Sequence, residues 1–292
     1  MAAKASMIAP ILKKYNVPLW LEPYIYDYVR ADPINAIKRA TSFIDVKRKK
    51  GVVTNSYVRL PNNTTFQTST IVHILSLFFY GAEEVARIAR QWASKPESDE
   101  RECVLQLTEM ADTYETRIRA IRNLLEGMGY KPLEPTKEVR EVFNYIESLE
   151  KWPERMVAMN ILFRQAYGST FGPTFYKAFY AVMPEFMRSF GKVFDGTSEV
   201  SKRGELIAAE MVKAKRIPDE RLIELAEDLL ARIQRSLNSE MPLAAHAGIK
   251  HEAELLRRIS LVYPLHTLME LGVPIDLARE EKAIAAKSHV GK

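Results

Sequence analysis

The chain has 292 residues, of which 47% are hydrophobic and 27% charged, and its formal net charge is +5 at pH 7. A chain of this length can bury one large core, and it contains no uninterrupted apolar stretch of the ~18 residues that a membrane-spanning helix needs. The single cysteine, Cys103, excludes an internal disulfide and a cysteine metal cluster, and its apolar neighbours predict a core position.

The first 66 residues are predicted to form an N-terminal appendage of short helices and extended chain. Its last part, residues 52–67, combines β-branched residues with turn signals and predicts a hairpin or an extended arm. Trp20 and Tyr24 belong to an aromatic segment that is too short to bury its own rings. We expect this segment to pack on the bundle of its own chain, with docking on another chain as the alternative.

Two long amphipathic helices are expected next. In the first, at about residues 69–93, apolar side chains recur at three- and four-residue steps, and Glu84 lies on the border of the apolar face. The second, at about residues 99–128, has an unbroken apolar stripe with Tyr114 at its centre and Arg117 at its edge. Glu84 is therefore expected to point inward.

The third long helix, at about residues 153–167, is apolar on nearly every side, so we expect it to be buried with Arg164 inside it. Gly172 and Pro173 should break or kink the chain after it. Further helices are expected at about 199–215, 219–237 and 243–271.

These patterns predict an all-α fold in three parts. An N-terminal helical and extended appendage covers residues 1–66, a helical bundle covers residues 67–273, and a C-terminal tail covers residues 274–292. The tail is rich in Lys and Ala, and we expect it to fray.

The second helix suggests a family. Residues 110–132, MADTYETRIRAIRNLLEGMGYKP, resemble the second helix of ferritin-like di-iron carboxylate proteins. Residues 81–91 are similar to the first helix of that family, and residues 155–165 to the third. The likeness covers roughly residues 69–200 and implies a ferritin-like bundle with additional C-terminal helices.

The resemblance also implies where metal ligands would lie. The family holds two metals with a Glu from each of two helices and a Glu-x-x-His pair from each of the other two. This sequence has no Glu-x-x-His. Tyr114 and Arg117 stand at one such pair of positions, Arg164 stands at a Glu position, and Glu84 alone keeps its type. In the fourth helix the corresponding pair would be Glu199 and Lys202, so that a Lys stands where the family has its His.

Three interpretations of these positions remain open. Two guanidiniums would repel a metal, so Glu84 is expected to pair with Arg164 or Arg117 in a buried polar network. Alternatively, Arg117, Arg164 and Tyr114 form a pocket for a small anion. In a different register, acidic residues would still bind metal: Glu84, Glu109, Asp112 or Glu115.

The sequence thus predicts a metal-free, cytoplasmic, ferritin-like protein without a cofactor, and favours a binding protein over an enzyme. It would act as a homo-oligomer or as a subunit with a protein partner, and its many charged helical residues suit a thermophile. One alternative is a non-heme di-iron or di-manganese oxidoreductase with atypical ligands. Another is an RNA- or ribosome-associated protein, which the positive net charge and the basic run at residues 47–50 would suit.

Overall fold

The structure is a computed structural model of the whole chain. It describes residues 52–53, 57–59, 65–94, 101–168, 184–246 and 250–289. The aromatic segment around Trp20, the basic run at residues 47–50 and the Gly172-Pro173 break lie outside the described residues.

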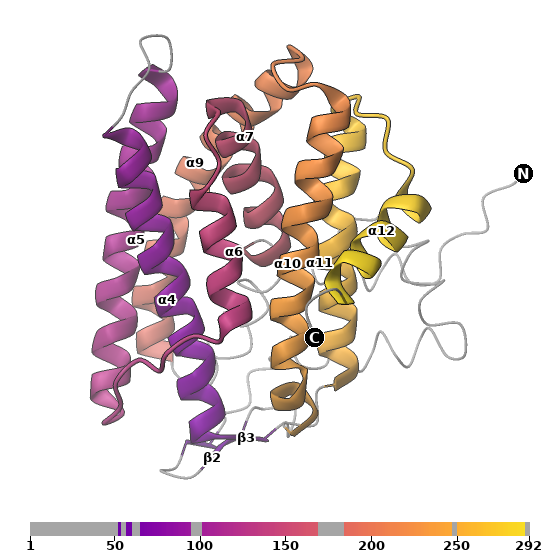
Figure 1. Cartoon of the computed structure of the whole chain (residues 1–292). Helices are drawn as coiled ribbons and strands as arrows, with labels where there is room; N and C mark the ends of the chain where they lie inside the picture. Colours follow the sequence, from indigo (N-terminus) through magenta and orange to yellow (C-terminus); the bar gives the residue numbers. More distant parts are fainter. Residues whose placement is uncertain are drawn as a thin grey trace, which may run out of the picture.

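The described chain is almost entirely helical, which confirms the expected all-α class (Figure 1). The helices follow in chain order: α4 (Thr68–Ala93), α5 (Arg101–Gly127), α6 (Lys137–Glu147), α7 (Trp152–Val157), the π-helix η2 (Ala158–Gly168), α9 (Pro184–Lys213), α10 (Asp219–His246), α11 (Lys250–Glu270) and α12 (Leu277–His289). No helix in these ranges is long and apolar enough to cross a membrane.

A small antiparallel sheet precedes the first of these helices. It consists of β1 (Val52–Val53), β2 (Tyr57–Arg59) and β3 (Thr65–Gln67), in the order β1-β2-β3. Val58 lies opposite Phe66 across the second pairing. The predicted hairpin is therefore confirmed, with one strand more than a simple hairpin.

Helices α4 and α5 form an antiparallel pair. Arg90 near the end of α4 binds Glu115 at 2.6 Å, whereas Arg122 near the end of α5 lies 3.5 Å from Glu83. The α5 helix ends where Gly129 adopts a positive φ of 80°, a conformation that glycine reaches without strain. The predicted bounds of both helices agree with the structure to within a few residues.

The core lies where α5 packs on α9, α9 packs on α7 and η2, and α10 contacts α6, η2, α11 and α12. Its largest fully buried side chains include Trp92 and Trp152. The guanidinium of Arg155 lies 5.3 Å and 5.5 Å from the centres of these two rings. Cys103 is buried in the same core, as predicted.

Several helices of the bundle differ from the elements expected from the sequence: α10 runs to His246 rather than ending near residue 237, and α11 begins at Lys250 rather than near residue 243. The helix α6 was not predicted, although Val139, Val142, Phe143 and Ile146 repeat at helical spacing and Thr136 caps its first turn. Helix α9 begins at Pro184, well before residue 199.

The expectation that residues 274–292 fray is wrong, because α12 occupies most of this segment and packs against α10. Ile284 on α12 is fully buried in the core. Burial of this one large apolar side chain stabilises a helix that its Lys- and Ala-rich composition alone would leave exposed.

Candidate functional site: a polar seam inside the bundle

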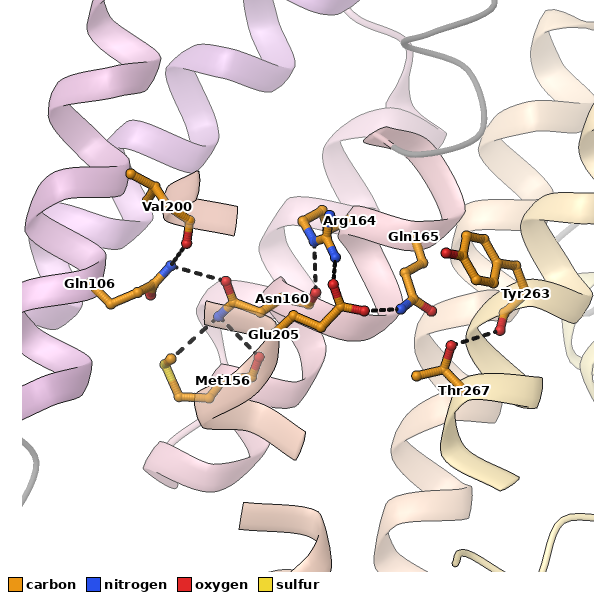
Figure 2. A network of polar contacts seen from close by, with 9 residues as sticks. All are labelled: Gln106, Met156, Asn160, Arg164, Gln165, Val200, Glu205, Tyr263 and Thr267. Carbon is orange, nitrogen blue, oxygen red and sulfur yellow. Dashed lines mark hydrogen bonds and ion pairs between the residues drawn. The ribbon is translucent and has the colours of Figure 1, made fainter. Parts of the chain in front are cut away.

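The most unusual local structure is η2, an 11-residue π-helix that directly continues α7. π-Helices are rare and mostly short, and they often mark functional sites, because the wider i→i+5 turn is less favourable than an α-helix. The segment places three polar side chains within an otherwise apolar run: Asn160, then Arg164 and Gln165 at four and five residues after it. They point toward α5 and α9 and form a polar seam through the bundle (Figure 2).

One end of the seam joins η2 to α5 and α9. Gln106 on α5 donates from its side-chain amide to Asn160 Oδ1 at 3.1 Å and to the backbone carbonyl of Val200 at 3.4 Å. Asn160 donates from Nδ2 to the carbonyl of Met156 at 3.2 Å. Both amide side chains are fully buried, so these bonds offset much of the cost of removing them from water.

The close approach of the helices at this point requires a glycine. A Cβ added at Gly204 of α9 would overlap with Asn160 Oδ1 and with Gln106 Nε2. Gly204 itself is buried. The missing side chain of Gly204 therefore makes the space in which the two amides meet.

The other end of the seam is ionic. Arg164 donates to Glu205 of α9, and Gln165 donates to the second oxygen of the same carboxylate at 2.6 Å. Arg164 also donates through Nε to the carbonyl of Asn160 at 3.1 Å. Tyr263 of α11 lies beyond Gln165, and burial, together with the charge of Glu205, raises the pKa of its hydroxyl (Figure 2).

The expected partner of Arg164 was wrong. Glu84 instead accepts from Arg87, one turn later on the same helix, at 2.6 Å, and Arg87 also binds Glu147 of α6 at 2.8 Å. Glu84 therefore lies on the side of α4 that faces α6. The prediction that Arg164 is paired with a carboxylate is confirmed, with Glu205 as that carboxylate.

Tyr114 and Arg117 lie together, but they do so on one helix. The guanidinium of Arg117 stacks on the Tyr114 ring at 4.6 Å from its centre. Burial lowers the pKa of Arg117, while the charge and hydrogen bonding of Tyr114 partly oppose this shift. Arg117 and Arg164 are thus held by different partners, Tyr114 and Glu205, which leaves the predicted anion pocket unsupported.

The acidic residues that would bind metal in the alternative alignment form ion pairs with arginines. Arg90 lies 3.2 Å from Asp112 and 2.6 Å from Glu115, and Arg203 of α9 lies 2.6 Å from Glu109. Within the ranges that the structure describes, no three His, Cys, Asp or Glu side chains are grouped as a metal site would require. The expected position for a fourth-helix acid, Glu199, is exposed.

Sequence reasoning missed four members of the seam: Gln106, Asn160, Gln165 and Glu205. A signal for two of them was present, because Asn160 and Gln165 interrupt the apolar run of the third predicted helix in the same way as Arg164. Glu205 gave no such signal, since α9 also carries many exposed charges.

Comparison with protein-family models, with curated proteins and with solved structures finds no match to this chain. The geometry of the chain itself therefore provides the basis for a function.

Proposed function

We propose that this chain is a metal-free, ferritin-like helical protein that acts by binding other protein chains, as a homo-oligomer or as a subunit of a larger assembly. The order of the helices supports the family. The antiparallel pair α4–α5 packs through α5 on α9, and α9 packs on α7 and η2, so these elements follow one another as in such bundles, in a core that α6, α10, α11 and α12 also share.

The observation that carries the proposal is the pairing of Arg164. The resemblance assigns this position to a metal-binding Glu, and here it holds a cation whose charge is already balanced by Glu205. Gln165 occupies the second oxygen of that carboxylate. A dication at this place would have to displace both donors and would meet the guanidinium at short range, which is unfavourable.

The same polar groups support a structural role for the interior. Gln106, Asn160 and Glu205 bond to neighbouring helices, so the seam fixes how α5, η2 and α9 meet. Buried hydrogen bonds of this kind favour one packing of the helices over others, although Gln106 Oε1 is buried without a hydrogen-bond partner among the described residues. The chemistry that reaches other molecules is then expected on the outside of the bundle.

The connection between α5 and α6 offers a contact surface. Tyr130 and Leu133 are large apolar side chains that are both exposed within four residues of the chain. Tyr is enriched at the centres of protein interfaces because it buries a large area at small entropic cost. We assign this pair to the proposed contact with a second chain.

Metal analysis tests the first half of the proposal. The full chain, produced in medium supplemented with iron and manganese and purified without chelator, should contain well under one transition metal ion per chain by mass spectrometry. The variant Glu205→Gln serves as a control for adventitious surface binding. Near-stoichiometric iron or manganese in the parent protein would overturn the proposal in favour of the di-metal oxidoreductase.

Light scattering tests the second half. The parent protein should have a mass of more than one chain, and the double variant Tyr130→Asp with Leu133→Asp should have a smaller mass with an unchanged helical signal. Leu105→Asp, at an exposed leucine on α5, is the matched control. A parent protein that stays monomeric at all concentrations would contradict the homo-oligomer.

A further inference from the structure

The surface between α10 and α12 contains a group of charges that the seam does not use. Glu227 and Asp228 of α10 both bind Lys287 of α12 at 2.7 Å. Glu280, in the first turn of α12, is only 1% exposed. The group therefore joins the last helix to the rest of the fold beside the buried Ile284.

Glu280 has too few partners for a buried ionised carboxylate. Its Oε2 atom is buried and accepts no hydrogen bond from the residues that the structure describes. The cation beside it, Arg279, lies 3.5 Å from Oε1, and the side chain of Arg279 is 71% exposed. A buried carboxylate with so little compensation costs several kcal/mol, so Glu280 is expected to hold a proton.

The neighbouring carboxyl group supplies the acceptor for that proton. A hydrogen bond between the carboxyl groups of Glu227 and Glu280 raises the pKa of Glu280 and lowers that of Glu227, and such a bond requires one of the two groups to hold a proton. Because Lys287 binds Glu227 directly, Glu227 is the member of the pair that stays ionised. The arrangement is a carboxylic acid that donates to a carboxylate, with one helix providing each.

We propose that this shared proton makes α12 a pH-sensitive latch: with Glu280 protonated the helix docks firmly on α10, and loss of the proton weakens the docking, so that Ile284 is exposed more often. Deprotonation would place two negative charges in contact, and Asp228 would add a third to a cluster that has Lys287 as its closest cation. Like charges at this range in a buried site repel strongly.

Arg279 of α12 offsets part of this repulsion, but its side chain is largely exposed to solvent. On α12 itself, Asp276 adds negative charge near Glu280. From α10, Arg235 donates to the backbone carbonyl of Lys287 at 2.8 Å, and from α11, Arg258 binds Glu281 at 2.8 Å. These two arginines hold α12 in place by contacts that do not depend on the Glu280 proton.

The direction of the pH effect follows from the pair. Burial and the hydrogen bond with Glu227 raise the pKa of Glu280 above its usual value of 4.5. Although burial opposes it, hydrogen bonds from Lys287 and Glu280 lower the pKa of Glu227. A raised pKa in the docked state means that the contribution of Glu280 to docking is fully present below about pH 4.5 and is lost as the pH rises to the docked pKa, by up to about tenfold per pH unit.

Hydrogen exchange measured by mass spectrometry on the full chain tests the latch. After correction for the intrinsic exchange rate, amide protection in residues 277–289 should fall by up to about tenfold per pH unit over this window. Protection of α5 should not follow the same course. The variant Glu280→Gln, which imitates the neutral acid, should keep α12 protected across the window.

The matched control is Glu281→Gln on the same helix, which removes the contact with Arg258. It should weaken protection of α12 by a similar factor at every pH and leave the slope unchanged. Protection of α12 in the parent that does not vary with pH, or an equal slope in Glu280→Gln, would overturn the proposal. If Glu280→Gln does not fold, infrared spectroscopy of the parent protein tests the proposal instead. A band from a protonated carboxyl group should disappear over the pH window in which α12 loses protection. If that band is absent at both acidic and neutral pH, the proposal is wrong.

Discussion

The carboxylate of Glu205 on α9 accepts hydrogen bonds from two consecutive residues of η2, Arg164 and Gln165. Consecutive side chains on a helix point in different directions, so a single acceptor reaches both only if it lies over the backbone between them. Glu205 therefore ties α9 to the widened turn of η2 through both of its oxygens, and loss of either charge disturbs both helices.

Breaking this pair should destabilise the fold. In Arg164→Ala the Glu205 charge is left partly buried, and the side chains are 20% and 31% exposed in the pair. We expect a loss of about 2–3 kcal/mol in the free energy of unfolding, somewhat less than for a fully buried pair. Replacing both residues with Leu should cost less than the single change. Urea denaturation followed by circular dichroism measures both.

The control for this experiment is Glu84→Gln. Its partner Arg87 is exposed and keeps Glu147, so the change should cost less than about 1 kcal/mol. If Glu84→Gln proved as costly as Arg164→Ala, the pairing of Arg164 with Glu205 would be incorrect.

The glycine in the seam gives a second test. Gly204→Ala should destabilise the protein by about 1–3 kcal/mol, because its methyl group would overlap with the amides of Asn160 and Gln106. Gly127→Ala, at the end of α5 with nothing within 4 Å of the added methyl, should be neutral or stabilising by up to about 1 kcal/mol.

A double variant distinguishes the steric overlap at position 204 from the general effect of replacing a glycine on stability. Asn160→Ala removes one of the atoms that the new methyl would meet, so the cost of Gly204→Ala should be smaller in that background than in the parent. Equal costs in both backgrounds, measured by thermal unfolding, would argue against the proposed overlap.

The sequence predicts most of the helices but not which surfaces meet. Apolar spacing gave α4 and α5 nearly to the residue, and it placed Glu84 at the border of the apolar face. Helix α6 covers that border. Its Glu147 forms an ion pair with Arg87, and Arg87 also pairs with Glu84. Since α6 was missed despite its readable spacing, Glu84 was assigned to the wrong neighbour.

The seam was only partly predictable for a different reason. Arg164 in an apolar run must find a carboxylate, and this requirement holds whatever the fold. The choice of Glu205 depends on the π-helical register of η2, which widens the turn and brings Gln165 to the same acceptor. No residue pattern in residues 158–168 distinguishes that register from an α-helix.

A histidine between α4 and α10 should make stability depend on pH. His73 Nε2 lies 2.7 Å from Glu240 Oε2. The hydrogen bond with Glu240 raises the pKa of His73, burial opposes this shift, and the charge of Glu240 adds to it. Because the folded pKa is raised above 6.5, the contribution is fully present below pH 6.5 and is lost as the pH rises through the folded pKa.

Comparison of His73→Gln with the parent isolates this contribution. The difference in unfolding free energy between the two should be larger at pH 5.5 than at pH 8.5, with about 1.4 kcal/mol for each unit by which the folded pKa is raised. The exposed His289 provides the control, and His289→Gln should show the same pH profile as the parent. A difference that does not change between these pH values would show that the ion pair contributes nothing to folding.

Helix α12, which sequence composition would assign to a frayed tail, should depend strongly on one apolar side chain for its docking. Ile284 is fully buried against the core, so Ile284→Ala should cost about 2–4 kcal/mol of docking free energy. Because α12 contacts mainly α10, the loss should appear first as weaker protection of residues 277–289 in hydrogen exchange, by roughly 30- to 1,000-fold. The matched change Ala285→Ser, one residue later at an exposed position, should leave the protection within a few-fold of the parent. A frayed tail would instead exchange at the intrinsic rate in all three proteins, and Ile284→Ala would then have no effect.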